Sequence, residues 1–385
     1  MITAELIDSN QSLEEVKSHL HRVSEMAIDL EFDKNRYRYG FNLCLMQIAT
    51  PDDCFLVDPL SPDLNVENLF PALENASTEK LVFAFGEDLR LLHQLGCFPK
   101  ALYDLKTAAS LLNYPPASLT DLLHQIIGVE VGASAQNSNW YKRPLSEKQI
   151  NYAADDVRFL GALRNQIEAE ADKQGIRSWI EEENERLNSV SFADLPESVA
   201  FRKKDMAGLS EFMWHVLKSL LEFREEVAKS VNRPSFQVIH KDLLVAIAGD
   251  PSALKQWNNT RMVHRAAHNS SVKRKLEEVL EEARAEAQSK GLSLGKPAVP
   301  RLSPEEYKRF REQRDMREKI KRDVFTPVKS RLVEQYGEHA ATFMLSNRAI
   351  DDLLIGNGEP LPQYRRQLLT EIGDELGLDV RPYLR

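Results

Sequence analysis

The chain has 385 residues, enough for two or three domains, and a formal net charge of −9. Hydrophobic residues make up 42% and charged residues 28%, a balance typical of a globular, soluble protein. No stretch approaches the roughly 18 uninterrupted apolar residues of a membrane span, and the first residues lack the pattern of a signal peptide. With only 16 glycines, the composition favours helices over an all-β fold.

Residues 1–170 predict an α/β domain with a mixed sheet. Short apolar runs predict strands at 25–32, 43–49, 54–58 and 81–85. Only ten residues separate the first two runs, which indicates an antiparallel hairpin. Helical periodicity predicts helices at 65–74, 87–95, 106–113, 119–127 and 146–173.

The remainder of the chain predicts two small all-α domains behind a polar, partly helical connector at 171–207. The first covers 208–288, with breaks at 232–234 and 249–251, and the second covers 303–385, with a break at 356–360. Between them, the glycine- and proline-bearing stretch 289–302 predicts a linker. The similar lengths of the two domains are compatible with a diverged duplication.

The net charge hides an asymmetry between the two halves. Residues 1–200 hold 17 basic and 32 acidic side chains, a balance of −15, whereas residues 201–385 hold 33 and 27, a balance of +6. A basic back half could attract a polyanion. Long helices with solvated charged faces explain the same composition, and charge alone does not separate the two interpretations.

Asp29 and Glu31 lie two residues apart in an apolar run, MAIDLEF at 26–32. In a strand, residues at i and i+2 point to the same face, so the two carboxylates would repel each other where they are costly to desolvate. A divalent cation between them would remove that conflict. Exposure on an edge strand would remove it as well, and the tripeptide leaves both possibilities open.

Three residues further along the chain are candidates for the same site. Asp88 lies where a predicted strand runs into a helix, although a carboxylate there can simply stabilise the helix N-terminus. Tyr152 and Asp156 are spaced i, i+4 on a predicted helix and therefore share one face, although a tyrosine there can also be a core residue. Asp155 points about 100° away from Asp156, and we expect it to face solvent.

These sites occur in the order that characterises one nuclease family. The chain resembles the ribonuclease D family, in the tyrosine-bearing branch of the DEDD 3′–5′ exonucleases. Further matching stretches are LCLMQIA at 43–49, Asp104 with TAASLL at 107–112, and QNSNWYKRPLS at 136–146. The stretches REEVA at 224–228, NRP at 232–234 and DLL at 242–244 resemble an HRDC domain, and SNR at 346–348 with YRR at 364–366 resembles a weaker second copy.

The resemblance implies a fold and a chemistry. It implies a ribonuclease H-like (DnaQ-like) exonuclease domain followed by two HRDC-type domains. It implies two divalent cations, Mg²⁺ or Mn²⁺, in one site. The implied metal ligands are Asp29, Glu31, Asp88 and Asp156. Tyr152 would orient the attacking water, and nucleoside 5′-monophosphates would leave one at a time from the 3′ end of an RNA, with tRNA precursors the implied substrates.

The chain departs from the family at a few positions. Phe83, Ala133 and Asn139 stand where the family often has His, Lys and Asp, and none of these is a family metal ligand. The histidine-bearing branch would place its histidine at the position of Asn151, so the assignment to the tyrosine branch is specific.

Five residues are candidates for substrate contacts. Arg36 and Arg38 belong to the loop DKNRYRYG at 33–40, where basic and aromatic residues could grip phosphates and stack a base. A solvated hairpin loop is the alternative. Gln136, Trp140 and Arg143 precede the Tyr152 helix, and Arg143 could instead brace that helix.

Two rival functions stay open on the sequence alone. A DNA 3′–5′ exonuclease would use the same metal chemistry. A non-catalytic nucleic-acid-binding scaffold would have a decayed site, and the intact set Asp29, Glu31, Asp88, Tyr152 and Asp156 argues against such decay. The three cysteines share no metal-type spacing and suggest reduced thiols in a cytoplasmic protein. We also expect a monomer with no membrane contact.

Overall fold

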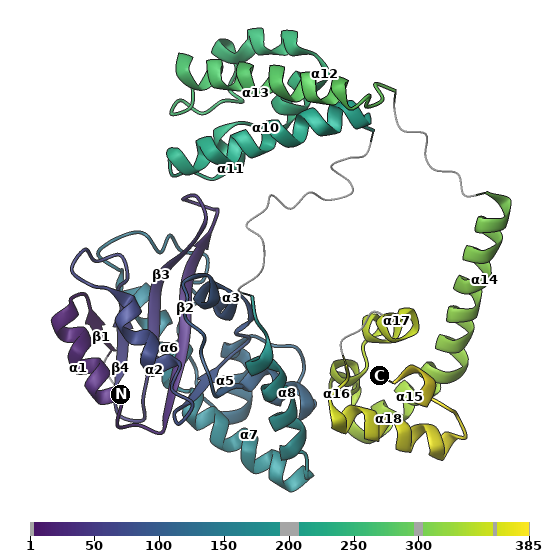
Figure 1. Cartoon of the computed structure of the whole chain (residues 1–385). Coiled ribbons are helices and arrows are strands. Elements are labelled where there is room, and N and C mark those ends of the chain that lie inside the picture. Colours follow the sequence, from purple (N-terminus) through teal and green to yellow (C-terminus); the bar gives the residue numbers. More distant parts are fainter. Residues whose placement is uncertain (1–3, 193–207, 296–302, 357–359, 385) are drawn as a thin grey trace. The chain divides into compact units, whose positions relative to one another are not determined.

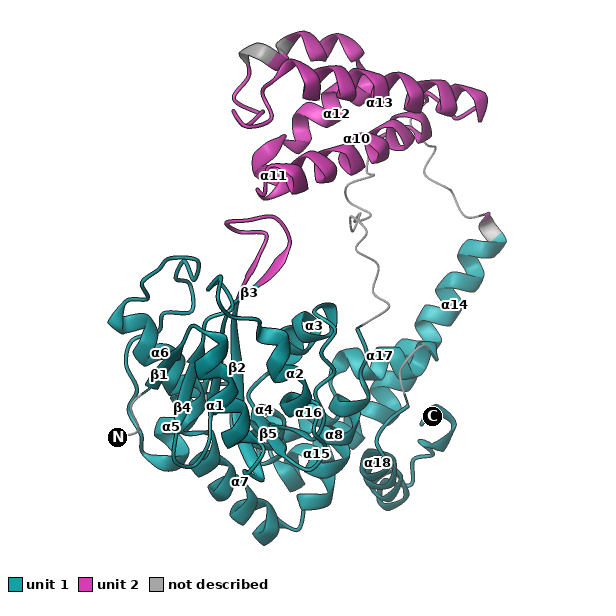
Figure 2. Cartoon of the chain, turned by 60° about the vertical axis from the view of Figure 1, so that its left-hand side comes forward, with its two compact units in different colours: residues 1–31, 43–194, 304–385 teal, residues 32–42, 195–303 magenta. Residues whose placement is uncertain are grey.

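The computed structural model describes residues 4–192, 208–295, 303–356 and 360–384 (Figure 1). They divide into two compact units, one formed by residues 1–31, 43–194 and 304–385, the other by residues 32–42 and 195–303 (Figure 2). No helix within the described ranges is long and apolar enough to cross a membrane.

The first unit is built on a six-stranded mixed sheet in the order β1-β4-β3-β2-β5-β6. The strands are β1 (Ala4–Ile7), β2 (Glu25–Lys34), β3 (Phe41–Ala49), β4 (Cys54–Val57), β5 (Glu79–Val82) and β6 (Leu102–Asp104). β3 is antiparallel to β4, whereas β1 pairs parallel with β4 and β5 pairs parallel with β2 and β6. β2 and β3 are neighbours joined by a short loop, which confirms the predicted hairpin.

Helices cover this sheet, and three of them matter most for the site. α6 (Glu147–Arg158) packs on β4 and β1, α7 (Leu160–Gln174) on β5, and α8 (Arg177–Ser189) on β6. A capping box fixes the start of α6, because Ser146 accepts the backbone N–H of Gln149 while the Gln149 side chain caps Ser146 in return. The other helical elements of this part are α1 (Asn10–Leu20), η1 (Val66–Leu69), α2 (Phe70–Leu73), α3 (Gly86–Gln94), α4 (Leu105–Leu111) and α5 (Leu119–Ile127).

Several elements differ from the predicted ones. The strands β1 and β6 and the polar helix α1 were not predicted. β1 and β6 have only four and three residues, too few for an alternation of apolar and polar residues to be recognised. The single helix expected at 146–173 is interrupted at Phe159, which separates α6 from α7. Residues 177–189, which the sequence pattern assigns to a connector, form α8 with Ile180 in the main core; the rest of that connector, 193–207, lies outside the described residues.

The helices at the end of the chain belong to the first unit. They are α14 (Pro304–Ile320), η3 (Lys321–Phe325), α15 (Thr326–Tyr336), α16 (Glu338–Met344), α17 (Asn347–Ile355), α18 (Gln363–Leu376) and η4 (Arg381–Tyr383). Phe325, Leu332 and Ile372 from these helices lie in the same buried cluster as Leu111 and Ile180 of the α/β part. The last helical region is therefore docked on the α/β part through a continuous core.

Polar contacts fix this docking at two places. The Arg365 guanidinium forms a buried ion pair with Glu183 of α8 at 2.6 Å, and the Tyr364 hydroxyl donates to the same carboxylate at 2.7 Å. At the second place, the Asn113 side chain accepts the backbone N–H of His339 at 2.9 Å and so caps α16. A Cβ at Gly337 would lie 2.1 Å from the Asn113 amide, so only glycine fits there.

The second unit contains a helical bundle with its own core. Its helices are α10 (Glu211–Ser230), α11 (Ser235–Val238), α12 (Lys241–Gly249), η2 (Pro251–Asn259) and α13 (Ser270–Ser289). The predicted breaks at 232–234 and 249–251 separate helices as expected, and the chain also turns at 260–269. Trp257, only 1% exposed, lies in the core of this bundle.

Candidate active site

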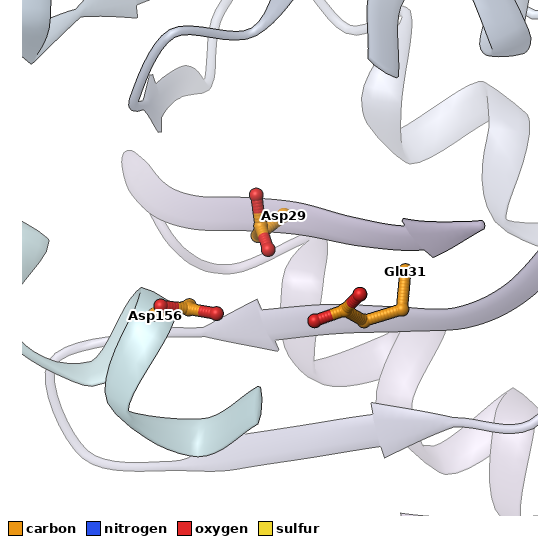
Figure 3. A group of neighbouring side chains, drawn as sticks. All are labelled: Asp29, Glu31 and Asp156. Atoms are coloured by element: carbon orange, nitrogen blue, oxygen red, sulfur yellow. The ribbon is translucent and has the colours of Figure 1, made fainter. Parts of the chain in front are cut away.

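The first pair of carboxylates stands on the strand β2, next to β3 and β5 in the sheet. Asp29 and Glu31 alternate with the buried Ile28 and Leu30, so both point to the same face. Asp156, from α6, reaches the same place (Figure 3). One carboxylate oxygen of each of these three residues lies within 4.8 Å of the others.

Asp88 adds a fourth carboxylate from the strand–helix junction between β5 and α3. The junction is strained, because Ala84 has a φ of 58°, a region that favours glycine. Its backbone N–H donates to Asp104 at 3.0 Å, which holds the turn in place. The Asp88 carboxylate accepts the backbone N–H of Leu30, between the first two acids. It lies outside the 4.8 Å group, but among neighbouring charges it raises the pKa of Asp29 most.

Burial raises the pKa of all four acids, and neighbouring carboxylates raise it further. The pKa of Glu31 rises to about 9, mainly through burial and then through the charges of Asp156 and Asp88. Burial raises the pKa values of Asp88 and Asp156 to about 7, and that of Asp29 well above its usual value. No cationic side chain is among the main causes of these shifts. Carboxylate oxygens that lie close together without a neighbouring positive charge are suited to bind hard divalent cations.

Tyr152 completes this group of residues. Its hydroxyl donates a hydrogen bond to the carboxylate of Asp156, one helical turn further along α6. Burial and the nearby carboxylates raise its pKa above the usual value, so the hydroxyl stays protonated at neutral pH. The ring lies 6.3 Å from the Trp140 ring between centroids. Tyr152 can therefore donate and accept hydrogen bonds beside the acids without carrying charge.

Asp155 was predicted to face solvent, and this prediction was wrong. The side chain is buried, with 6% of its surface exposed, and it forms an ion pair with Arg158. Burial still raises its pKa, while Arg158 opposes the shift. Of the two neighbouring acids of α6, Asp155 is therefore buried, while Asp156 stays partly exposed at the site.

Arg143 is fully used inside the protein. A guanidinium has five N–H donors. Those of Arg143 bind the carboxylate of Asp58 and the backbone carbonyls of Cys44, Trp140 and Lys142. This pattern favours the bracing alternative over a substrate contact. Asp58, which directly follows β4, was not singled out from the sequence, because a lone acid after a strand carries no signal by itself.

The other substrate candidates are placed differently. Trp140 is buried in a cluster with Leu45 and Ala153 and supports the Tyr152 helix from inside. Gln136 is exposed in the loop before α6. Arg36 and Arg38 are exposed in the β2–β3 loop, where Asp33 accepts their backbone N–H groups at 3.1 and 2.9 Å.

Known proteins with similar sequences belong to one class of enzyme. Residues 4–172 match the family model for 3′–5′ exonucleases. A ribonuclease D of Desulfotalea psychrophila is 30% identical over 271 residues, which is 68% of this chain and 71% of that protein. A ribonuclease D of Bartonella henselae is 28% identical over 63% of this chain, and the match spans only 60% of that protein.

Two solved structures share the fold over almost the whole chain. The RNase D of Escherichia coli has 21% sequence identity and a TM-score of 0.67, with 97% of this chain and 99% of that chain covered. A protein from Bifidobacterium adolescentis has 17% identity and a TM-score of 0.73, with the same coverage. At these identities the likeness concerns the fold alone.

The mixed sheet, the carboxylate cluster and the match over residues 4–172 together define a 3′–5′ exonuclease. More narrowly, the chain belongs to the ribonuclease D family. It is thus a hydrolase of the 3′–5′ exoribonuclease class.

Proposed function

We propose that the protein removes nucleotides one at a time from the 3′ end of RNA by metal-dependent hydrolysis and releases nucleoside 5′-monophosphates. The observation that carries this proposal is the convergence of Asp29, Glu31 and Asp156 within 4.8 Å, with Asp88 and Tyr152 beside them. No positive side chain is among the main influences on these acids, so the site suits cations and the phosphates that cations attract.

Asp29, Glu31, Asp88 and Asp156 would hold the two divalent cations, Mg²⁺ or Mn²⁺. When bound, such cations supply Lewis-acid activation of water and neutralise charge on the scissile phosphate. The protein contributes the arrangement of the acids. The strand fixes Asp29 and Glu31, the Leu30 N–H holds Asp88, and the Tyr152 hydroxyl holds Asp156.

Tyr152 would orient the attacking water. Its raised pKa argues against a phenolate acting as general base at neutral pH. A protonated hydroxyl can instead accept a hydrogen bond from the water while it donates its own proton to Asp156. In this role, loss of the hydroxyl lowers kcat and leaves cation binding largely intact.

We further propose structured RNA, with tRNA precursors as the first candidates, as the physiological substrate. The Escherichia coli RNase D is described as an exoribonuclease involved in structured RNA processing, and it shares this fold over 97% of the present chain. The helical regions at 208–288 and 303–385 would act as HRDC-type domains that hold the body of such an RNA. A cytoplasmic location and a monomeric state complete the proposal.

The decisive experiment is a metal-dependent cleavage assay on one 3′-labelled sequence, prepared as RNA and as DNA. We expect stepwise release of 5′-monophosphates from RNA with Mg²⁺ or Mn²⁺, and none after chelation. Faster release from DNA would favour the DNA exonuclease, and binding without any release would favour the non-catalytic scaffold.

The raised pKa values predict how the cation-free protein responds to pH. The folded state keeps protons on Glu31, Asp88 and Asp156 that the unfolded chain has already lost above about pH 5. The stability that these protons provide is therefore lost as pH rises through about 7 to 9. Each proton held only by the folded state changes the free energy of unfolding by about 1.4 kcal/mol per pH unit.

We accordingly expect the thermal midpoint in chelator to fall between pH 6 and pH 9. Added Mg²⁺ should raise the midpoint more at pH 9, because the ionised acids bind it. In Asp156→Asn the thermal midpoint should change less with pH. The change that remains in this variant measures the contribution of all other titrating groups. A midpoint in chelator that rises over this range, with the same slope in the variant, would contradict the cluster described here.

α14 carries a stripe suited to an RNA strand. Tyr307, Phe310, Arg314 and Arg317 of α14 recur at helical spacing, which Lys321 at the start of η3 continues, and both aromatic side chains are at least half exposed. The three cations line a hollow of about 270 Å³ whose opposite wall includes Leu354 and Ile355 of α17. Aromatic and basic groups on one face favour single-stranded nucleic acid, although Lys321 also pairs with Asp351 at 2.9 Å.

We predict that the double variant Arg314→Ala, Arg317→Ala weakens binding of a structured RNA. The slope of its salt dependence should fall by about 1 for each phosphate that the variant no longer neutralises. Filter binding at several salt concentrations measures both effects. Arg309→Ala, an exposed arginine of α14 outside the stripe, is the matched control. Equal slopes of the salt dependence for wild type and double variant would show that the stripe does not contribute to RNA binding.

A further inference from the structure

Gln47 has a polar side chain with no protein partner in the core. It lies in β3 between Met46 and Ile48, with 0% of its surface exposed. Among the described residues, neither its Nε2 nor its Oε1 has a hydrogen-bond partner. Burying an amide without hydrogen-bond partners lowers the stability of the fold, whereas an apolar side chain of this size carries no such penalty. The presence of an amide at this position therefore indicates a functional role.

The strand pattern places Gln47 beside the acids. Ala49 of β3 pairs with Cys54 of β4, whose thiol lies near Asp155 and Arg158 of α6, whereas the next residue of β4, Phe55, contacts His19 of α1 on the other face. Side chains alternate between faces along a strand, so Gln47, two residues before Ala49, also faces α6. Asp29, on the neighbouring strand β2, faces α6 as well, because its carboxylate meets that of Asp156. Asp29 and Gln47 are therefore neighbours on the face that carries the site.

The helix above them is the one that bears Asp156. Leu45, two residues before Gln47, shares a buried cluster with Ala153 of α6, and Ala49 shares another with Ala154 and Val157. In the sheet, β3 lies between β2 and β4, and α6 packs on β4. This position in the middle of the sheet explains why solvent does not reach the amide.

Asp29 has room for another hydrogen bond. The one group found to stabilise its charged form is the backbone N–H of Leu30. Opposite residues on antiparallel strands have Cβ atoms about 4.5–5.5 Å apart, a span that the two-carbon stem of a glutamine covers. Carboxylates that bind metal ions are usually held by hydrogen bonds from neighbouring groups.

We propose that Gln47 is a positioning residue of the metal site, whose amide N–H donates to the Asp29 carboxylate when that carboxylate is ionised and binds cation. This inference rests on the proposed function. The amide would fix the orientation of Asp29 without touching substrate, and its unmet hydrogen-bonding capacity in the cation-free protein is the cost of that role.

The test is Gln47→Met, which keeps the volume and removes the amide. We expect the cation-free variant to be as stable as wild type or more stable, because a buried polar group is gone. Its Mg²⁺ affinity, measured by calorimetric titration without RNA, should fall by about 10–100-fold. kcat should fall at limiting Mg²⁺, while KM for RNA stays unchanged. Met46→Leu, a buried apolar exchange on the opposite face of β3, is the control.

The outcomes separate the inference from the function. Wild-type protein without Mg²⁺ binding or turnover would refute the proposed function itself. Wild-type activity with unchanged Mg²⁺ affinity in Gln47→Met would overturn only the role of Gln47. If Gln47→Met does not fold, Gln47→Asn takes its place, because it keeps the amide but on a shorter stem that no longer reaches Asp29. A reduced Mg²⁺ affinity of this variant would support the proposal, and an unchanged Mg²⁺ affinity would overturn it.

Discussion

Asp156→Asn should abolish hydrolysis, with at least about a thousandfold loss in kcat, the order of loss seen when a central electrostatic group is removed from an active site. The change removes one of the proposed cation ligands and also weakens the hold on the Tyr152 hydroxyl, so two parts of the proposed site fail together. RNA binding should survive, because the substitution leaves the remainder of the surface intact.

The same variant should be more stable than wild type in chelator at neutral pH. Asp156 raises the pKa values of Asp29 and Glu31, so its neutral replacement relieves repulsion in the cluster. Glu147→Gln, an exposed acid on the same helix, is the matched control and should keep full activity. Turnover of Asp156→Asn close to that of the control would rule out this site as the catalytic centre.

Arg365→Ala should destabilise the protein by about 3–5 kcal/mol, the cost of leaving one partner of a buried ion pair without the other. Arg365 and Glu183 are 8% and 7% exposed, and the guanidinium also donates to the backbone carbonyl of Met344 at 3.1 Å. Without the arginine, the buried Glu183 charge keeps only the Tyr364 hydroxyl at 2.7 Å and the more distant Arg186 guanidinium at 3.7 Å. Urea unfolding of the full chain measures the loss.

Arg366→Ala removes an exposed arginine at the next position and should change the stability little. The exchange Glu183→Gln with Arg365→Met, which removes both charges, should recover much of the loss, since no isolated charge remains. Equal unfolding midpoints for Arg365→Ala and Arg366→Ala would mean that the ion pair contributes nothing to the docking of the last helices.

The sequence predicted the acidic residues better than their surroundings. Asp29 and Glu31 could be placed on one face because strand alternation is a local rule, and Tyr152 and Asp156 because helical spacing is local as well. Asp155 could not be placed, since its burial depends on the sheet beneath α6. Gln47 belongs to the stretch 43–49 that matches the family, yet only the packing around it shows that its amide lacks a partner.

The same distinction holds for the domains. The polar run at 181–185 predicts a solvated connector, but Glu183 turns inward to meet an arginine 182 residues later in the chain. The sequence around Glu183 contains no pattern that predicts such a distant partner. The helical character of 303–385 was predicted from periodicity, whereas its shared core with the α/β part depends on contacts of long sequence separation.

The order of segments in the first unit has a consequence for synthesis on the ribosome. The catalytic strands and helices emerge first, but Phe325, Leu332 and Ile372, which close their core, come only after residue 304. At about 5–20 residues per second, translating the intervening segment takes on the order of 5–20 s. During that time the nascent chain exposes an apolar surface and lacks the α16 residues that Asn113 caps. The enzyme would therefore complete this unit only once residues 304–385 have been translated, after the inserted helical bundle has had time to fold.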